Sequence, residues 1–265
     1  MSEIRAMLPG LIDPATAKET TARIKAALDA APGGDPDGTL MLTVSVEAVV
    51  LAHAEYRRRG IPDEVFVSTM GCFPRFVAEH EASYGQYGFD REWWTWRQLS
   101  LRLFRLGELE FEYADRPDDL FLAKYADAAA ETGSAKSDVS RQINIHIPSD
   151  AKLTPEACAE SLRRARAFTE RYFPDWSDAP MTCESWLLSP VLPDLLPADS
   201  NIVRFQSMFD VIGVESESEA WREWIFRRNP APVAELPEDT SLQRAVKSHL
   251  LNGGAIGSGV GVLRE

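Results

Sequence analysis

Residues 142–190 read QINIHIPSDAKLTPEACAESLRRARAFTERYFPDWSDAPMTCESWLLSP, and this stretch predicts a strand, a helix and a second strand. QINIHIP alternates isoleucine with polar residues, as a half-buried strand does. Thr154 is a good N-cap residue and Pro155 suits the first helical position, so the helix begins there. Pro174 ends the helix, because proline cannot continue one. A helix that joins two strands returns the chain to the same end of the sheet, so the two strands should be parallel.

The chain around this unit predicts an α+β fold. The first hundred residues predict helices, including one over 40–59. ELEFEYA at 108–114 alternates apolar and acidic residues, which is typical of a strand with one wet, acidic face. We expect a helical N-terminal domain over 1–98 and a second domain over 99–265 with a mixed sheet flanked by helices. Further strands are predicted at 200–214 (one long strand or two short ones) and at 255–263, and further helices at 215–226 and 236–254.

The charge of the chain excludes two classes of partner. Its 265 residues include 41 acidic and 28 basic side chains, which give a formal net charge of −13. Such a balance repels nucleic-acid phosphate and anionic membranes, and no concentrated basic face is present. We therefore expect neither nucleic acid nor membrane as a partner. A homo-oligomer is compatible with the sequence, which does not determine the oligomeric state.

Cysteine and histidine usage predicts a reduced, metal-free protein. Cys72, Cys158 and Cys183 are odd in number and widely spaced, so they predict neither a disulfide framework nor a CxxC metal pair. The four histidines have no ligand spacing, so no metal is expected. The N-terminal MSEIRAMLPGLIDP lacks the apolar core of a signal peptide, and the apolar stretch at 40–54 is too short and polar to span a bilayer. These features together predict a cytoplasmic location.

Glycines cluster near the end of the chain, from Gly253 to Gly261. No helix follows them, which excludes a P-loop and a Rossmann fingerprint. Instead they predict a helix C-cap, a turn and a final strand that passes close to another backbone.

The second half of the chain resembles a family of bacterial acyltransferase-like proteins, in which a helical N-terminal domain precedes a GNAT-like C-terminal domain. The segments of the family follow one another in the same order here. The resemblance rests on FRLGELEFE at 104–112, on residues 143–176, on CESWLLSPVLPDLLPADSNIVRFQSMF at 183–209 and on LPEDTSLQRAVKSHLLNGGAIGSGVGVL at 236–263.

This resemblance implies a fold and an activity. It implies a strongly bent mixed sheet in which two neighbouring parallel strands splay apart, so that acyl-CoA enters the V between them. The strand-helix-strand unit at 142–190 matches that central unit. The implied function is transfer of an acyl group from acyl-CoA, with acetyl-CoA as the expected donor, to a small amine or hydroxyl acceptor.

One element of GNAT proteins is missing from this sequence. They carry a glycine-containing loop whose backbone N–H groups hold the pyrophosphate of CoA at the start of a helix. The corresponding loop is PSDAKLTPE at 148–156, which has no glycine. Lys152 offers a charge and Thr154 begins the helix, so these two residues are candidates for CoA binding, whereas Asp150 and Glu156 oppose phosphate. The absence motivates an alternative function, a catalytically inactive GNAT-like ligand-binding or scaffold protein.

The space between the two strands separates these functions. An open groove between 143–147 and 182–188 favours an enzyme. A groove that is filled by Trp186, by Phe205 or by the C-terminal segment favours the scaffold.

His146 is the first candidate for a general base. It lies at the carboxyl end of its strand, on the face opposite the isoleucines, and ligands of α/β folds tend to bind at such ends. An imidazole titrates near neutral pH, as a base must. The alternative is a structural histidine that braces the loop at Pro148, and both interpretations stay open.

Glu184 and Ser185 on the second strand complete the candidate catalytic set. A partly buried carboxylate at Glu184 would be a usable base, and Ser185 would donate a hydrogen bond to a thiolate or carbonyl oxygen. An ordinary hydrogen-bonded strand serine is the alternative for Ser185. Alternation places Cys183 on the face opposite Glu184. We interpret Cys183 as a small buried residue rather than a nucleophile, because no basic partner adjoins it.

Arg204 is the third candidate for CoA binding. On the strand predicted at 200–214, Arg204 and Gln206 share a face and would form a polar stripe able to hold an anion. The alternative is a surface ion pair in an acidic protein.

Overall fold

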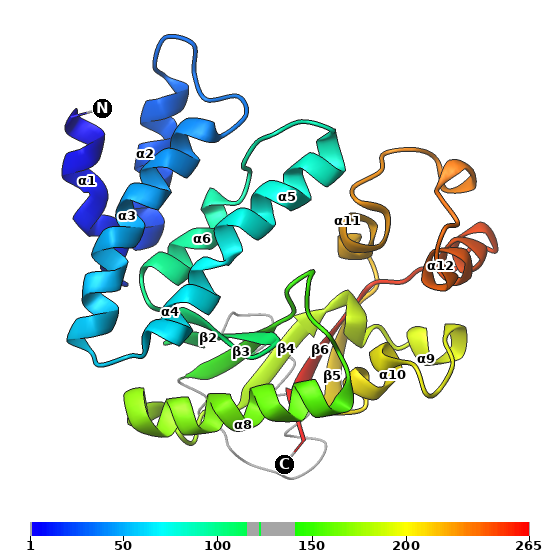
Figure 1. Cartoon of the computed structure of the whole chain (residues 1–265). Helices are drawn as coiled ribbons and strands as arrows, with labels where there is room; N and C mark the ends of the chain where they lie inside the picture. Colours follow the sequence, from blue (N-terminus) through cyan, green and yellow to red (C-terminus); the bar gives the residue numbers. More distant parts are fainter. Residues whose placement is uncertain (1, 116–121, 123–140, 265) are drawn as a thin grey trace. The chain divides into compact units, whose positions relative to one another are not determined.

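The computed structural model describes residues 2–115, 122 and 141–264, which form two compact units, Met1–Glu112 and Tyr113–Glu265 (Figure 1). A helical N-terminal region followed by a mixed sheet with helices confirms the predicted α+β fold. The predicted domain boundary between residues 98 and 99 stays a prediction.

The first unit begins with helices, as predicted for the first hundred residues. They are α1 (Ser2–Ile12), α2 (Ala17–Asp29), α3 (Thr39–Arg58), α4 (Asp63–Met70), α5 (Cys72–Tyr84) and α6 (Glu92–Leu99). An antiparallel hairpin of β1 (Leu103–Leu106) and β2 (Leu109–Ala114) follows. Gly107 in its turn has φ of 86°, a left-handed conformation that favours glycine.

The longest helix described in this unit is α3. Its start is stabilised by the buried carboxylate of Asp35, which accepts the N–H groups of Leu40 at 2.9 Å and Met41 at 2.8 Å. By length and composition alone α3 could cross a membrane, contrary to the expectation from the shorter stretch at 40–54, and 39% of its most apolar window is buried within the structure. Its buried side consists of Met41, Val44, Ser45, Ala48, Ala52 and Tyr56.

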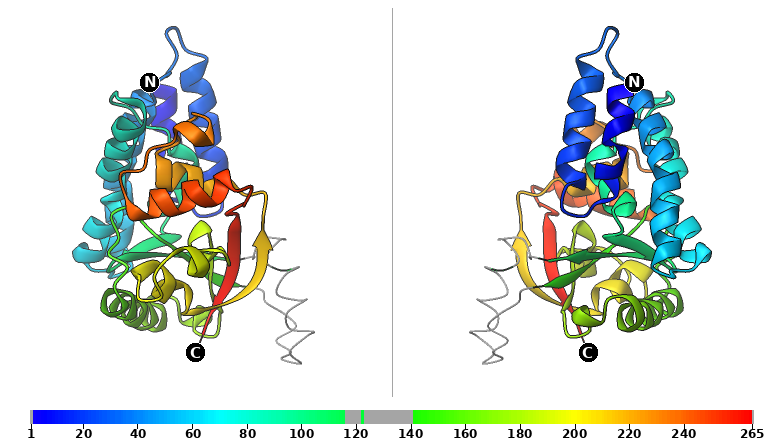
Figure 2. Two further views of the ribbon diagram at one scale, coloured as in Figure 1. Left: turned by 90° about the vertical axis from the view of Figure 1, so that its right-hand side faces the viewer. Right: turned by 90° about the vertical axis from the view of Figure 1, so that its left-hand side faces the viewer.

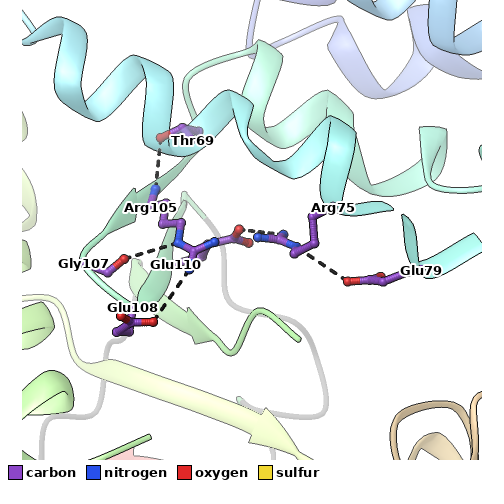
Figure 3. A network of polar contacts seen from close by, with 7 residues as sticks. All are labelled: Thr69, Arg75, Glu79, Arg105, Gly107, Glu108 and Glu110. Carbon is purple, nitrogen blue, oxygen red and sulfur yellow. Dashed lines mark hydrogen bonds and ion pairs between the residues drawn. The ribbon is translucent and has the colours of Figure 1, made fainter. Parts of the chain in front are cut away.

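The acidic face of β2 is not wet, contrary to the prediction from its sequence. Glu110 is 2% exposed and accepts a hydrogen bond from Arg75 of α5 over 2.8 Å, and Arg75 also lies 3.6 Å from Glu79 (Figure 3). The backbone N–H of Arg105 donates to Thr69 Oγ1 of α4 over 3.0 Å. These contacts fasten the hairpin to α4 and α5. The alternation of residues along β2 could not show that Arg75, from a distant part of the sequence, pairs with the carboxylate of Glu110.

The second unit contains a sheet in the order β3–β4–β6–β5 (Figure 1). β3 (Gln142–His146) and β4 (Met181–Ser185) are parallel, whereas β6 (Ser258–Leu263) is antiparallel to β4 and to β5 (Phe209–Glu215). Figure 2 shows β5 and β6 side by side from both directions. Among residues 141–264 the α-helices are α8 (Pro155–Tyr172), α9 (Leu192–Leu195), α10 (Asn201–Gln206), α11 (Ala220–Phe226) and α12 (Ser241–Leu251).

Helix α8 is the crossover between the two parallel strands, as predicted. Thr154 Oγ1 accepts the N–H of Ala157 over 3.3 Å, and Pro155 is the first helical residue. The helix ends at Tyr172, two residues before Pro174. The strand-helix-strand unit therefore forms where its local signals place it.

The segment at 200–214 is not a continuous strand, and this part of the prediction was wrong. Its first residues form α10, and β5 begins only at Phe209. Ser200 is the N-cap of α10 and its Oγ accepts the N–H of Val203 over 3.3 Å. The cap outweighs the strand preference of the β-branched residues Ile202 and Val203.

The glycines of β6 allow a neighbouring segment to cross the sheet at close range. A Cβ atom at Gly259 would lie 2.3 Å from the carbonyl oxygen of Leu188, and one at Gly261 would lie 2.9 Å from Leu188 Cδ1. Leu188 ends the short 3₁₀ turn η2 (Trp186–Leu188) that follows β4. The close approach predicted for the final strand is therefore confirmed.

We expect Gly259→Ala to lower the free energy of unfolding by roughly 1–3 kcal/mol, because the new methyl group meets backbone that cannot step aside as a side chain can. Urea denaturation measures this change. Gly71→Ala is the control, since Gly71 has φ of −57° and the nearest atom, the carbonyl oxygen of Ser68, would lie 3.2 Å from the new Cβ. Equal stability of both variants would contradict the close crossing at Gly259.

Candidate active site

β3 and β4 pair over only a short distance before they separate. In the described residues their register consists of Ile143 with Met181 and Asn144 with Thr182. Both strands continue beyond these pairs, β3 to His146 and β4 to Ser185. The carboxyl ends therefore diverge, and this is the V that the resemblance predicted.

β6 pairs with the outer edge of β4, whereas in the described part of the chain no strand pairs with the end of β4 that faces the V. β6 pairs with β4 along Thr182, Cys183, Glu184 and Ser185. Because a strand has two hydrogen-bonding edges, the C-terminal segment takes the edge that faces away from β3. β3 pairs only with the first two residues of β4, so within the described residues no strand pairs with the inner edge of residues 183–185.

Four polar residues share one face of the sheet at this fork. Paired residues of neighbouring strands point to the same side, so Asn144 and Thr182 share a face. Alternation places His146 on the same face of β3 and Glu184 on the same face of β4. The two candidate bases therefore stand on the two arms of the V and on one side of it.

His146 and Glu184 differ from each other in their exposure, and only Glu184 departs from its prediction. His146 is half-buried, whereas Glu184 is exposed, so the partial burial expected for that carboxylate is absent. In water an imidazole is a stronger base than a carboxylate near neutral pH. With the expected burial of Glu184 absent, His146 remains the first candidate of the two.

Ser185 makes a hydrogen bond within the protein, and Cys183 is buried in the core. Ser185 Oγ accepts the N–H of Leu187 over 3.1 Å and so caps the turn η2. Cys183 is fully buried, and this burial, together with the nearby charge of Glu184, raises the pKa of its thiol. A thiol that stays protonated is a poor nucleophile, in agreement with its interpretation as a buried core residue.

The candidate phosphate contacts lie before α8. Thr154 is half-buried and its hydroxyl caps the helix, while Lys152 is exposed in the loop. The first N–H groups of α8 point outward from the helix start, as at any helix N-terminus. Asp150 and Glu156 are also exposed there, so the loop carries both signs of charge.

Arg204 does not form the expected stripe with Gln206. Arg204 is exposed on α10, whereas Gln206 is 8% exposed and its Nε2 donates to the carbonyl oxygen of Ser189 over 2.7 Å. The two side chains belong to a helix and point in different directions. The reason for placing Arg204 in a binding site was therefore wrong.

Trp186 and Phe205, the two aromatic residues considered as fillers of the V, both have packing partners in the second unit. Trp186 packs against a hydrophobic cluster that consists of Trp221, Ile225, Phe226, Leu236, Val246 and Ile256. Phe205 is 1% exposed and its ring lies 5.1 Å from that of Phe209. The contacts of both side chains are thus accounted for elsewhere in the second unit.

Asn144 and Thr182 were not among the predicted site residues. Asn144 was visible as the polar residue two positions before His146, which was a usable signal. Thr182 gave no signal, because its position beside Asn144 depends on the register between two strands that 34 intervening residues separate in the sequence.

Both halves of the chain match known protein families. Residues 103–263 match the GNAT-like C-terminal domain, and residues 3–101 match the N-acyltransferase N-terminal domain. Among curated proteins, no sequence matches the chain.

Solved structures of acyltransferases have a similar fold over nearly the whole chain. One, in complex with decanoyl-CoA and teicoplanin, is 28% identical with a TM-score of 0.72, and the match covers 99% of this chain and 88% of that one. A second, in complex with CoA and 10C-teicoplanin, is 27% identical with a TM-score of 0.72 and coverage of 100% and 88%. A third, a variant with octanoyl-CoA, is 26% identical with a TM-score of 0.72 and the same coverage.

Proposed function

The chain belongs to the acyltransferases that join an N-acyltransferase N-terminal domain to a GNAT-like C-terminal domain, and on this premise we propose that it moves an acyl group from acyl-CoA to an amine or hydroxyl group of a small molecule. The observation that carries the proposal is the divergence of β3 and β4 after Asn144 and Thr182. An open strand edge beside a candidate base is what a thioester donor needs.

The open edge of β4 suits the pantetheine arm of CoA. That arm carries amide groups, which can hydrogen-bond to backbone N–H and C=O groups as an added strand would. Lys152 and the first turn of α8 are the proposed contacts for the phosphates. No binding role is proposed for Arg204.

The proposed reaction needs a general base and an acyl donor, which is the thioester of acyl-CoA. As the lone pair of the acceptor nitrogen or oxygen forms a bond to the thioester carbon, its proton passes to His146. The tetrahedral intermediate then collapses, the C–S bond breaks, and CoA leaves as a thiolate that takes up the proton held by His146. Glu184, on the other arm of the V, is the second choice for the base.

Medium-length acyl chains are the proposed donors in place of the acetyl group expected from the sequence. The similar structures hold octanoyl-CoA and decanoyl-CoA, at 26–28% identity to this chain. One of them also holds teicoplanin, which makes a glycopeptide amine the first acceptor to test.

We expect turnover with octanoyl-CoA and decanoyl-CoA to exceed turnover with acetyl-CoA. Release of the CoA thiol in the presence of teicoplanin measures the rate, and isothermal titration measures the binding of each acyl-CoA. Faster turnover with acetyl-CoA would contradict the chain-length proposal. No saturable binding of any acyl-CoA at millimolar concentration would overturn the proposed function.

The same experiment tests the alternative function. The loop at 148–156 lacks the glycines that grip pyrophosphate, which is the observation that favours a catalytically inactive ligand-binding or scaffold protein. Saturable binding of acyl-CoA without thiol release, over a panel of amine and hydroxyl acceptors, would establish that alternative.

A further inference from the structure

Asn144 and Thr182 form the last pair before β3 and β4 separate. Thr182 is 3% exposed, and its hydroxyl donates to Oδ1 of Asn144 over 3.5 Å. The contact is long for a hydrogen bond between two oxygen atoms, but it places the amide oxygen of Asn144 toward Thr182 and the amide nitrogen on the opposite side. Asn144 is half-buried, and the described residues hold no hydrogen-bond acceptor for its Nδ2.

The amide nitrogen stands at the place where the reaction would occur. Asn144 precedes His146 by two residues on the same strand face, and the strands open directly after it. A substrate carbonyl that enters the V beside His146 thus meets an oriented neutral donor at the fork.

We propose that Asn144 is a further catalytic residue, whose Nδ2–H donates to the thioester oxygen as that oxygen becomes negative, and this inference rests on the proposed function. When the acceptor atom bonds to the thioester carbon, the π electrons of the carbonyl move to oxygen. Asn144 stabilises that oxyanion while His146 holds the acceptor's proton. The oxyanion then reforms the carbonyl and expels CoA as the thiolate.

A donor of this kind acts on the rate rather than on substrate binding. The charge on oxygen exists only near the transition state, so the hydrogen bond strengthens there. Thr182 is a positioning residue in this arrangement, because it acts on the substrate only through the orientation of Asn144.

Asn144→Asp is the sharpest variant, because the carboxylate keeps an acceptor for Thr182 and nearly the same shape but loses the N–H donors. We expect its kcat to fall about a hundredfold or more, since loss of one oxyanion donor has that effect. Asn144→Ala should lose about as much. Thr182→Val should lose only about three- to tenfold, because the amide remains but is less well held. Thr182→Ser keeps the hydroxyl and is the matched control.

Two further measurements separate catalysis from structure. Isothermal titration with the best acyl-CoA should give each variant an affinity near that of the unmodified protein. Thermal unfolding should place Asn144→Asp near the unmodified protein. Turnover in the unmodified protein together with unchanged kcat in Asn144→Asp or Asn144→Ala would overturn the inference alone. Parallel losses of kcat and acyl-CoA affinity would also overturn it, since Asn144 would then bind the ground state. Absence of turnover in the unmodified protein with every acyl-CoA would overturn the proposed function and the inference with it.

Discussion

Replacement of His146 by alanine or asparagine should reduce turnover by about 10²–10⁴-fold while leaving the stability of the protein near its original value. Alanine removes the base, and asparagine keeps a hydrogen-bonding edge but cannot take a proton near neutral pH. Because His146 is half-buried at the end of β3, an enzyme that lost only this base should still fold and bind acyl-CoA. Thiol release under saturating donor and acceptor measures the loss.

The pair of variants also tests the structural interpretation of His146. If the imidazole only braces the loop at Pro148, asparagine should keep most of the stability, whereas alanine should lose about 1–3 kcal/mol. His53→Asn is the matched control, because His53 lies on α3 and forms an exposed contact of 2.8 Å with Asp63. Turnover of His146→Ala that rises with pH would show hydroxide replacing the lost base. Wild-type turnover in His146→Ala would end the assignment and make Glu184 the next residue to test.

Local signals in the sequence predicted the framework of the second unit. Thr154, Pro155 and Pro174 act on neighbouring backbone groups, so their effect on α8 could be read without knowledge of the fold. The same reasoning failed at α10, where the β-branched Ile202 and Val203 suggested a strand. There the cap at Ser200 was the stronger signal, and Arg204 was assigned to a strand face that does not exist.

The candidate site depends on how β3 and β4 pair, and this pairing cannot be predicted from the sequence of either strand alone. The shared face of His146 and Glu184 follows from the pairing of Asn144 with Thr182, and that register is set by the packing of a whole crossover unit. His146 was found because its residue type and its place at a strand end are local properties. Asn144 became a candidate only when Thr182 was seen to orient it.

The burial of charged side chains is a second property that the alternation in the sequence predicted wrongly. It leads to the largest change in stability that we expect in the first unit. Glu110 on β2 and Arg75 on α5 form an ion pair of 2.8 Å, and their side chains are only 3% and 8% exposed (Figure 3). Arg75 also lies 4.9 Å from the ring centroid of Phe76, so its guanidinium is surrounded by protein. Water cannot replace a lost partner at such a site.

Glu110→Ala should therefore lower the free energy of unfolding by about 3–5 kcal/mol, because it leaves the buried guanidinium without its main counter-charge. Urea denaturation of the full chain measures the change. Glu160→Ala is the matched control, since Glu160 also pairs with an arginine at 2.7 Å but on the surface of α8, where water replaces the partner and little change is expected.

The double variant Arg75→Met with Glu110→Leu decides whether the loss comes from an orphaned charge or from the net strength of the pair. Apolar side chains of similar size carry no desolvation cost, so the double variant should recover most of the stability that Glu110→Ala loses. If the double variant is as unstable as the single one, the pair itself holds the hairpin of β1 and β2 against α5. If Glu110→Ala is as stable as the unmodified protein, the burial of this pair in the first unit is wrong.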